Sequence, residues 1–426
     1  MRIAIMTMGT WGDVMPFMAL AKGLTARGFD VTLVTSEDFE AAARNHGIAY
    51  ARIRMNFGRY VNSNDCKAAM AGSIAATKRH QQAFMARRRQ MLDDCWHSAQ
   101  GSDAIICNSI LFPAYHIAEK RNIPLLFAGV SPLYTPTRAF PYPYLLNRNL
   151  GPWLNRLTWK LWRLTTHGEY ATVRDWCLET VKTRPPQKWT NYLFRRDRQV
   201  PVVYFYSPSL VPRPKDWHAD TFVSGYWYEK NPNEWSPPDE LSEFLNTEPA
   251  PIYIGFGSIV GSNPARLTEQ VMSAIRTAGE RAVVATGWGG MVRAEDHTES
   301  VYCIESIPHE WIFPRVKAVV HHGGAGTTWN GLRFGRPTLA CPMTADHWFW
   351  AKRIHRLGAG PRYISQLPWK PLRARDLAQG IRELAGNDSM QKRAEQLGRR
   401  IRKEDGVARA VEFIGRQIES WRNFLH

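Results

Sequence analysis

The length of 426 residues excludes a single ordinary core and predicts two domains of about 200 residues each. A composition of 44% hydrophobic and 22% charged residues is typical of a globular protein and excludes a disordered one. The net charge of +17 indicates an acidic ligand, nucleic acid or an anionic membrane as partner, and charge alone does not choose among them.

The N-terminal residues and the cysteines indicate the cellular compartment. Residues 1–6 are apolar, but Gly9 and Asp13 follow too soon for a signal peptide, and no apolar run is long enough to cross a bilayer. The six cysteines form no CxxC pair, which is typical of reduced, buried thiols. We therefore expect a cytoplasmic protein, with peripheral attachment to the cytosolic face of a membrane as a second possibility.

The first forty residues predict a βαβ unit. Residues 2–6 form a short apolar strand, 9–13 are a tight turn, and 16–27 have the apolar spacing of a helix. Gly28 ends this helix, and 31–35 is the next strand. Such a unit opens a parallel, doubly wound sheet, and further strands are predicted at 104–107 and 124–128.

The same pattern begins again in the second half of the chain. The predicted elements there are strands at 251–258, 281–286 and 318–321 and a helix at 267–278. The stretch 208–238 between the halves is rich in proline and tryptophan and is interpreted as the interdomain connection.

A glycine-rich turn in the second half carries the strongest functional signal. Residues 319–333, VVHHGGAGTTWNGLR, predict a buried strand that ends in glycines and opens a helix. Backbone N–H groups in such a turn can approach a diphosphate, and the start of the helix adds partial positive charge. A purely structural turn, in which the glycines allow close helix–sheet packing, remains the alternative on the glycines alone.

Flanking segments extend this motif. Together with residues 307–314 (IPHEWIFP) and 342–350 (PMTADHWFW), it resembles the donor-binding signature of nucleotide-sugar-dependent glycosyltransferases with the GT-B fold. Residues 253–258 and 9–17 (GTWGDVMPF) resemble the sterol glucosyltransferase and lipid-acceptor branch. The resemblance covers most of the chain and is weakest near 55–100 and 165–200.

The resemblance implies an α/β protein with two Rossmann-like, doubly wound domains that face each other across a cleft. Residues 1–207 would be the acceptor-binding domain and 239–404 the nucleotide-sugar domain, joined by the connection 208–238. A final helix within 405–426 would cross back to the N-terminal domain.

The resemblance also implies roles for individual donor-side residues. Residues that match the diphosphate contacts of the family are Ser258, His322, Gly324, Gly326 and Thr327. Asp346 and His347 match the pair that holds the sugar. The family usually has Gln at the second position, so glucose is favoured and galactose stays open. Ser306 and Ile307 match the nucleoside site, and Ser306 stands where plant relatives carry a stacking Trp. The resemblance to the sterol branch favours uracil as the base, and thymine stays open.

Asp13 matches the position of the catalytic base in the family. A carboxylate there can accept the proton of an acceptor hydroxyl as its oxygen attacks the anomeric carbon. The alternative is that Asp13 only caps the helix that begins near Val14. The sequence contains no Asp-x-Asp and no ligand cluster with metal spacing, so we expect transfer without a metal or other cofactor.

The acceptor side is expected in the N-terminal half, with Trp11, Ser131 and Tyr134 as candidate pocket residues. Residues 151–167 are rich in Trp, Leu and basic side chains and predict an amphipathic helix. This helix could lie in a membrane interface or cover the acceptor pocket. Either role favours a lipophilic acceptor such as a sterol, carotenoid, lipid or aromatic natural product.

The prediction is an inverting transfer of hexose from a UDP-sugar to a hydroxyl of such an acceptor. A glycosyltransferase that uses a TDP-deoxysugar is the alternative within the same class. A nicotinamide-dependent oxidoreductase is less consistent, because residues 9–13 lack GxGxxG and Asp13 would repel a pyrophosphate. The basic residues are dispersed and accompany no nucleic-acid motif, so no nucleic acid partner is expected.

Overall fold

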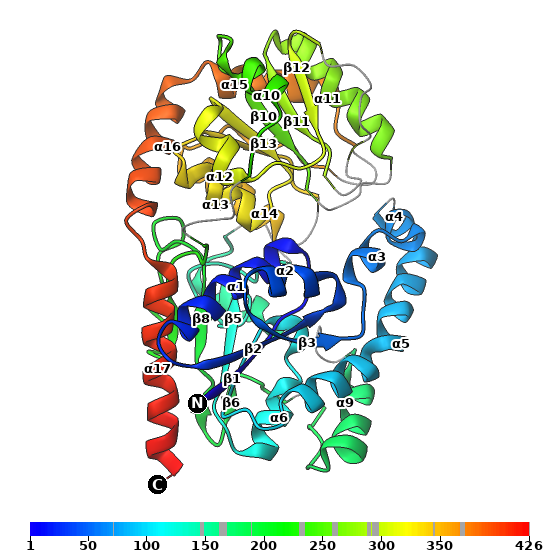
Figure 1. The fold of residues 1–426 in the computed structure, drawn as a ribbon, viewed down its shortest axis with the longest axis vertical. Coiled ribbons are helices and arrows are strands. Elements are labelled where there is room, and N and C mark those ends of the chain that lie inside the picture. Colours follow the sequence, from blue (N-terminus) through cyan, green and yellow to red (C-terminus); the bar gives the residue numbers. More distant parts are fainter. Residues whose placement is uncertain are drawn as a thin grey trace. The chain divides into compact units, whose positions relative to one another are not determined.

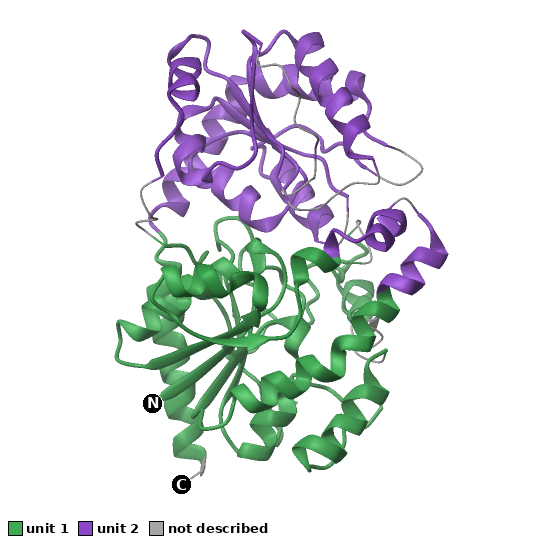
Figure 2. Cartoon of the chain, turned by 45° about the vertical axis from the view of Figure 1, so that its right-hand side comes forward, with its two compact units in different colours: residues 1–60, 81–230, 404–426 green, residues 61–80, 231–403 purple. Residues whose placement is uncertain are grey.

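The structure is a computed structural model. It describes residues 1–70, 72–144, 149–161, 168–188, 190–229, 235–257, 263–287, 291, 298–343, 346–366 and 371–425. Contacts divide the chain into two compact units, coloured separately in Figure 2. Unit 1 comprises Met1–Tyr60, Gln81–Lys230 and Glu404–His426, and unit 2 comprises Val61–His80 and Asn231–Lys403.

Unit 1 is built on a parallel sheet of seven strands in the order β3-β2-β1-β4-β5-β8-β9 (Figure 1). The bounds are β1 Arg2–Met6, β2 Asp30–Ser36, β3 Ala49–Ile53, β4 Ala104–Cys107, β5 Leu125–Gly129, β8 Val202–Tyr204 and β9 Thr221–Val223. The order reverses between β1 and β4, as in doubly wound folds, where ligands gather at the carboxyl ends of the strands near this switch point.

Helices and a short hairpin complete unit 1. The helices described up to residue 181, together with the last one, are α1 Trp11–Thr25, η1 Glu37–Phe39, α2 Glu40–Asn45, α3 Phe57–Val61, α4 Asn64–Met70, α5 Ile74–Ser98, η2 Ser109–Leu111, α6 Ala114–Arg121, α7 Pro152–Thr158, η3 Trp159–Leu161, α9 Tyr170–Trp176, η4 Cys177–Val181 and α17 Gly406–Leu425. Of these, α4 and the first residues of α5 group with unit 2. The hairpin pairs β6 Phe194–Arg195 with β7 Arg198–Gln199.

Two parts of unit 1 differ from the sequence-based expectation. Helix α1 begins at Trp11 rather than near residue 16, because Thr10 and Asp13 cap its first turn. The stretch 208–229, interpreted as connecting chain, contributes strand β9 and the buried side chains of Trp217 and Trp227 to unit 1. Burying two large aromatic rings makes this stretch part of a core rather than a free linker.

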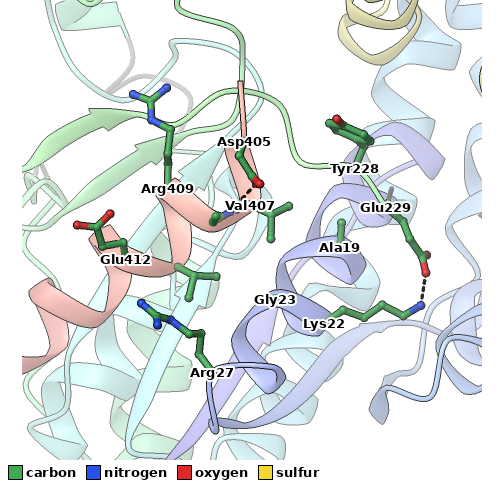
Figure 3. Close-up of a pocket in the computed structure, with 12 residues that line it drawn as sticks. Ala19, Lys22, Gly23, Arg27, Tyr228, Glu229, Asp405, Val407, Arg409 and Glu412 are labelled. Atoms are coloured by element: carbon green, nitrogen blue, oxygen red, sulfur yellow. Dashed lines mark hydrogen bonds and ion pairs between the residues drawn. The ribbon is translucent and has the colours of Figure 1, made fainter. Parts of the chain in front are cut away.

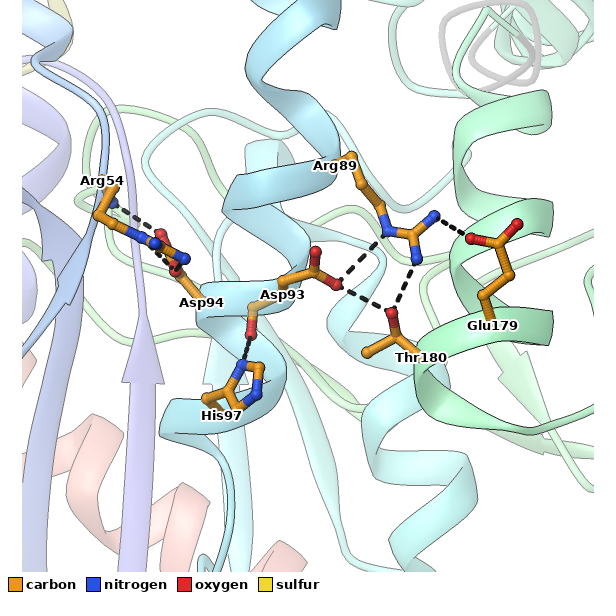
Figure 4. Close-up of polar contacts among 7 residues, drawn as sticks. All are labelled: Arg54, Arg89, Asp93, Asp94, His97, Glu179 and Thr180. Carbon is orange, nitrogen blue, oxygen red and sulfur yellow. Dashed lines mark hydrogen bonds and ion pairs between the residues drawn. The ribbon is translucent and has the colours of Figure 1, made fainter.

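Ion pairs anchor the long helix α5 within unit 1 (Figure 4). Both oxygens of the Asp94 carboxylate are used, since Oδ1 accepts from the Arg54 guanidinium at 2.6 and 2.9 Å and Oδ2 from the Arg54 backbone N–H at 2.8 Å. One turn earlier, Arg89 donates to Glu179 and Thr180 of η4, at 2.9 Å each. These contacts join α5 to residues that lie some 40 and 90 positions away in the sequence.

Unit 2 is built on a second parallel sheet, of five strands in the order β12-β11-β10-β13-β14. Its strands are β10 Ile252–Gly255, β11 Ala282–Ala285, β12 Val301–Ile304, β13 Ala318–His321 and β14 Thr338–Ala340. Its helices are α10 Asp239–Asn246, α11 Pro264–Ala278, α12 His309–Ile312, η5 Phe313–Arg315, α13 Ala325–Arg333, α14 His347–Arg356, α15 Ala374–Ala385 and α16 Asp388–Ile401. The predicted α/β class with two doubly wound parallel sheets is thereby confirmed.

The core of unit 2 lies on both faces of its sheet. Ile252 and Ile254 of β10 pack into a cluster with α11 and α15, while Tyr253 packs into the opposite cluster with Phe313. Successive strand residues point to opposite faces, so a strand buried on both sides is apolar throughout. This is why the short apolar runs in the sequence could be recognised as strands.

The last helix, α17, belongs to unit 1 and packs on α1, where Gly23 faces Val407 and Val411. Across the parts of the chain that the structure describes, no helix combines the length and the hydropathy that a membrane span requires.

Candidate functional site

The glycine-rich turn of unit 2 joins β13 to α13. Strand β13 ends at His321, and Ala325 opens the helix after Gly324, its N-cap residue. Gly323 has φ +94°, a backbone conformation that strongly favours glycine. Among the residues that the structure describes, no side chain caps α13, and the N–H groups of its first turn point out of the helix without intrahelical partners. This arrangement is suited to an anion such as a diphosphate.

The ring of His322 lies against the backbone of two glycines. A Cβ atom on Gly257 would come within 2.7 Å of His322 Cε1, and one on Gly324 would overlap Nε2. Any larger residue at either position would therefore displace the ring. The predicted diphosphate residues His322 and Gly324 are thus in direct contact, and Gly326 and Thr327 follow in the first turn of α13. Ser258 lies outside the described residues.

Four histidines gather beside this turn. The rings of His322 and His347 are 4.8 Å apart between centroids, and those of His321 and His322 are 5.8 Å apart. His309 stacks on Phe313 at 4.5 Å. Burial lowers the pKa of His322 to about 3 and the pKa values of His309 and His347 to about 4, and it lowers that of His321 well below its usual range.

These shifts make the rings neutral at pH 7. A histidine with a depressed pKa resists protonation in the folded state but not in the unfolded chain. The stability linked to these groups is therefore present above about pH 6.5, declines as pH falls below it, and is lost by about pH 3–4.

Several ring nitrogens of this cluster are buried without a hydrogen-bond partner. His321 Nδ1 accepts from the Gly323 N–H at 2.9 Å, which leaves the ring proton on Nε2. Within the described residues, His321 Nε2, His322 Nδ1 and His347 Nδ1 have no partner. Buried polar atoms are normally paired, so unpaired ones beside a glycine turn indicate a place for a ligand.

Asp346 and His347 lie at the start of α14. His347 is only 6% exposed, and its ring packs against His322, so the predicted sugar-binding and diphosphate-binding residues come together. The Trp350 indole N–H donates to Asp346 Oδ2 at 3.3 Å. This contact fixes the carboxylate at the first turn of α14.

The predicted nucleoside residues differ in exposure. Ser306 is exposed, whereas the Ile307 side chain is buried in the unit 2 core beside Tyr253. Ile307 could therefore meet a nucleoside mainly through its backbone. Sequence reasoning named no role for His309, two residues further on, because its place in the histidine cluster depends on how α12 packs.

Asp13 occupies the third position of α1 in unit 1. Its Oδ2 accepts from the Thr10 backbone N–H at 2.9 Å and from the Thr10 hydroxyl at 3.2 Å. Asp13 thus caps the helix, as the alternative interpretation expected, and the same bonds hold its carboxylate at the carboxyl end of β1. Capping orients the group and does not exclude a role as a base.

Asn108 supports this loop from the neighbouring strand end, and the sequence analysis did not identify it. Its Nδ2 donates to Met8 O at 2.6 Å and to Thr7 Oγ1 at 3.1 Å, and Thr7 in turn donates to Asp13 O at 3.0 Å. The residues are about 100 positions apart, so no local sequence pattern could have revealed the pairing.

The candidate acceptor residues also follow strand ends in unit 1. Trp11 comes after β1 and packs edge-on against Phe39 at 5.0 Å, while Ser131 and Tyr134 come after β5 and are 1% and 2% exposed. The Tyr134 hydroxyl donates to Ala128 O at 2.9 Å, and burial raises its pKa well above the usual range. Tyr134 is therefore better suited to packing behind the acceptor pocket than to a hydrogen bond with the acceptor.

No group of three or more His, Cys, Asp or Glu side chains that could hold a metal ion occurs among the residues with described positions.

Solved structures with this arrangement are glycosyltransferases of the GT-B fold. The glycotransferase of kitacinnamycin matches with a TM-score of 0.68 at 18% identity, over 98% of each chain. The glycosyltransferase VinC in complex with DTDP matches with a TM-score of 0.66 at 17% identity, over 99% of this chain and 100% of that one. At such identities the likeness shows the fold alone, and the predicted GT-B fold is confirmed.

Sequence comparison gives the family. Residues 3–141 match the glycosyltransferase family 28 N-terminal domain, and residues 283–405 match the erythromycin biosynthesis protein CIII-like C-terminal domain. The sterol 3-beta-glucosyltransferase UGT80A2 of Arabidopsis thaliana is 33% identical over 99% of this chain and 66% of its own length. The sterol 3-beta-glucosyltransferase of Neosartorya fischeri is also 33% identical, over 98% of this chain.

The chain belongs to the family 28 glycosyltransferases, in the branch similar to sterol glucosyltransferases. It spans about 30% of the length of the Neosartorya fischeri relative. This membership argues against the oxidoreductase and nucleic-acid alternatives.

Proposed function

We propose that this chain transfers a hexose from a UDP-sugar to a hydroxyl of a lipophilic acceptor, with inversion and without a metal. The observation that carries the proposal is the histidine–glycine turn, with its unpaired ring nitrogens and uncapped helix, in a family 28 glycosyltransferase. The names of the similar proteins support a sterol as the acceptor class.

The proposed reaction divides between the two units. Asp13 of unit 1 takes the proton of the acceptor hydroxyl as its oxygen bonds to the anomeric carbon. The bond from that carbon to the diphosphate breaks, and negative charge grows on the leaving oxygen. His322 and the N–H groups at the start of α13 stabilise this charge, because fixed donors act where charge develops in the transition state.

The proposal is tested with purified protein, a panel of UDP- and TDP-sugars and a set of sterols and other lipophilic alcohols, in buffer with and without EDTA. Product mass spectrometry should find a glycoside formed from a UDP-hexose, at the same rate in EDTA. The DTDP-bound relative and the match to an erythromycin biosynthesis domain favour TDP-sugars as the second candidate donors. If the protein consumes neither UDP-sugars nor TDP-sugars, the proposal is contradicted.

We propose that His347 selects the sugar. His347→Gln should change the ratio of glucose to galactose transfer by about tenfold, because a buried group paired with one hydroxyl is left unsatisfied by the epimer, at about 1–3 kcal/mol. UDP affinity should change little. Competition between UDP-glucose and UDP-galactose measures the ratio, and His355→Gln, on the same helix, is the control. An unchanged ratio would make His347 a packing partner of His322 only.

We also propose that α7 contacts a membrane surface. Its Trp153, Leu154 and Leu157 are 75%, 42% and 41% exposed. The exposed Lys160 of the adjoining η3 adds positive charge, while Arg156 pairs with Asp216 at 3.8 Å. Interfacial helices place such aromatic and aliphatic groups at headgroup depth, and cations attract anionic lipid. Residues 162–167 of the expected helix lie outside the described part.

The double variant Trp153→Ala/Leu157→Ala should bind vesicles of phosphatidylcholine and phosphatidylserine at least about tenfold more weakly, since each side chain contributes about 1.5–3 kcal/mol when buried. Cosedimentation gives the partition coefficient. Ile74→Ala, which removes a side chain that is 87% exposed on α5, should bind as wild type. Equal binding of the double variant and wild type would leave α7 as a cover for the acceptor pocket.

A further inference from the structure

Unit 1 holds a cavity of about 500 Å³ that no residue discussed for transfer lines (Figure 3). It lies between α1 and the first turns of α17, with Tyr228 and Glu229 on its border. Cavities of this size are typical of sites for small molecules.

The cavity adjoins two of the four places where the chain passes between the units. The chain leaves unit 1 after residue 230, just beyond Tyr228 and Glu229, and returns at Glu404, just before Asp405. A ligand here would touch both passages within unit 1.

The floor of the cavity is apolar. Ala19 and Gly23 come from α1, and Val407 and Val411 from α17. A Cβ atom on Gly23 would overlap Val407, so glycine brings the two helices close at this point. Burial of a small apolar group against these side chains is favourable, at roughly 25 cal/mol per Å².

The carboxylates on the rim already have partners. Glu229 pairs with Lys22, and it also accepts from His46 Nδ1 at 2.8 Å. Asp405 accepts from the Ala408 backbone N–H at 3.0 Å at the start of α17, and Glu412 pairs with Arg416 one turn further on.

Two arginines on the rim make no ion pair among the residues that the structure describes. Arg27 is exposed at the end of α1, and the Arg409 guanidinium donates to the Val223 carbonyl oxygen at 3.3 Å and lies over the Phe222 ring. Guanidinium groups bind carboxylates and phosphates through paired N–H donors. Glu229 and Glu412 each pair with a cation, so Arg27 and Arg409 are offset only by the one carboxylate of Asp405, and the lining keeps a positive surplus.

We propose that this cavity is a binding site for a small amphipathic anion, a carboxylate or phosphate monoester on a short apolar body. The apolar body lies against Val407 and Val411, and the anionic group pairs with Arg27 and Arg409. None of the residues that line the cavity is among those proposed to act in transfer.

Calorimetry on the full chain tests the proposal with decanoate, decyl phosphate, decanol and inorganic phosphate. Decanoate or decyl phosphate, or both, should bind saturably, and the stronger of the two identifies the headgroup. Decanol and inorganic phosphate should each bind at least about fivefold more weakly, because decanol lacks the anionic group and inorganic phosphate lacks the apolar chain.

Two variants locate the binding. Arg27→Gln, at an exposed position, should lower the affinity for decanoate and decyl phosphate about fivefold and leave the affinity for decanol unchanged. Val407→Asp, checked for folding by circular dichroism, should abolish saturable binding. Arg276→Gln, an exposed arginine near the end of α11 in unit 2, is the matched control and should bind as wild type. Equal anion affinity in Arg27→Gln and wild type would overturn the proposal.

Discussion

Replacing Asp13 with asparagine is expected to lower the transfer rate by about 10²–10⁴ and to leave UDP affinity nearly unchanged. An amide cannot take the proton of the acceptor hydroxyl, whereas the proposed donor contacts lie in unit 2. The side-chain carbonyl oxygen of the new amide can still accept from the Thr10 N–H, so the cap of α1 should persist. Initial rates with a sterol acceptor and calorimetry with UDP give the two quantities.

Asp13→Ala separates the two roles of this side chain. It removes both the base and the cap, so it should lose transfer to the same extent and also destabilise α1 by about 1 kcal/mol. Thermal unfolding of the two variants supplies this comparison. Turnover like that of wild type in Asp13→Asn, with its unfolding also unchanged, would reduce Asp13 to a helix cap.

The second large effect is expected at His322. His322→Ala should weaken UDP binding by about tenfold to a hundredfold, because hydrogen bonds to charged groups contribute about 1.5–3 kcal/mol. It should slow transfer as well, since the leaving diphosphate loses a donor. Calorimetry with UDP and initial rates at saturating donor measure the two effects.

His321→Ala is the matched control, one residue earlier, at the end of β13. His321 is fully buried and accepts from the Gly323 N–H, so its loss leaves that group unpaired and should destabilise unit 2 by about 1–3 kcal/mol. Its folded fraction should still bind UDP more tightly than His322→Ala does. Equal UDP affinity in wild type and His322→Ala would remove His322 from the diphosphate site.

Contiguous patterns in the sequence were sufficient for the strands and the donor turn. Strands β1, β4 and β13 lie at their expected positions because a strand buried on both faces forms a short, nearly continuous apolar run. The turn after β13 could be read because its glycines, histidines and following helix adjoin one another in the chain. The family signature that marks this turn is likewise local.

Contacts between residues far apart in the chain could not be predicted from the sequence. The support of the Asp13 loop by Asn108 joins positions about 100 residues apart, and the cavity between α1 and α17 joins positions at opposite ends of the chain. The burial of Trp217 and Trp227, which makes β9 part of unit 1, also depends on neighbours that the local composition does not reveal.

The sequence by itself determined the fold class, the strands and the donor motif, because strand periodicity, turn chemistry and helix starts act over a few neighbouring residues. Only the tertiary structure decided that Asn108 supports the loop of Asp13, and that His309, His321, His322 and His347 share one buried cluster. Burial sets the charge state of these rings, and burial is a property of packing among residues that the chain brings together only when it folds.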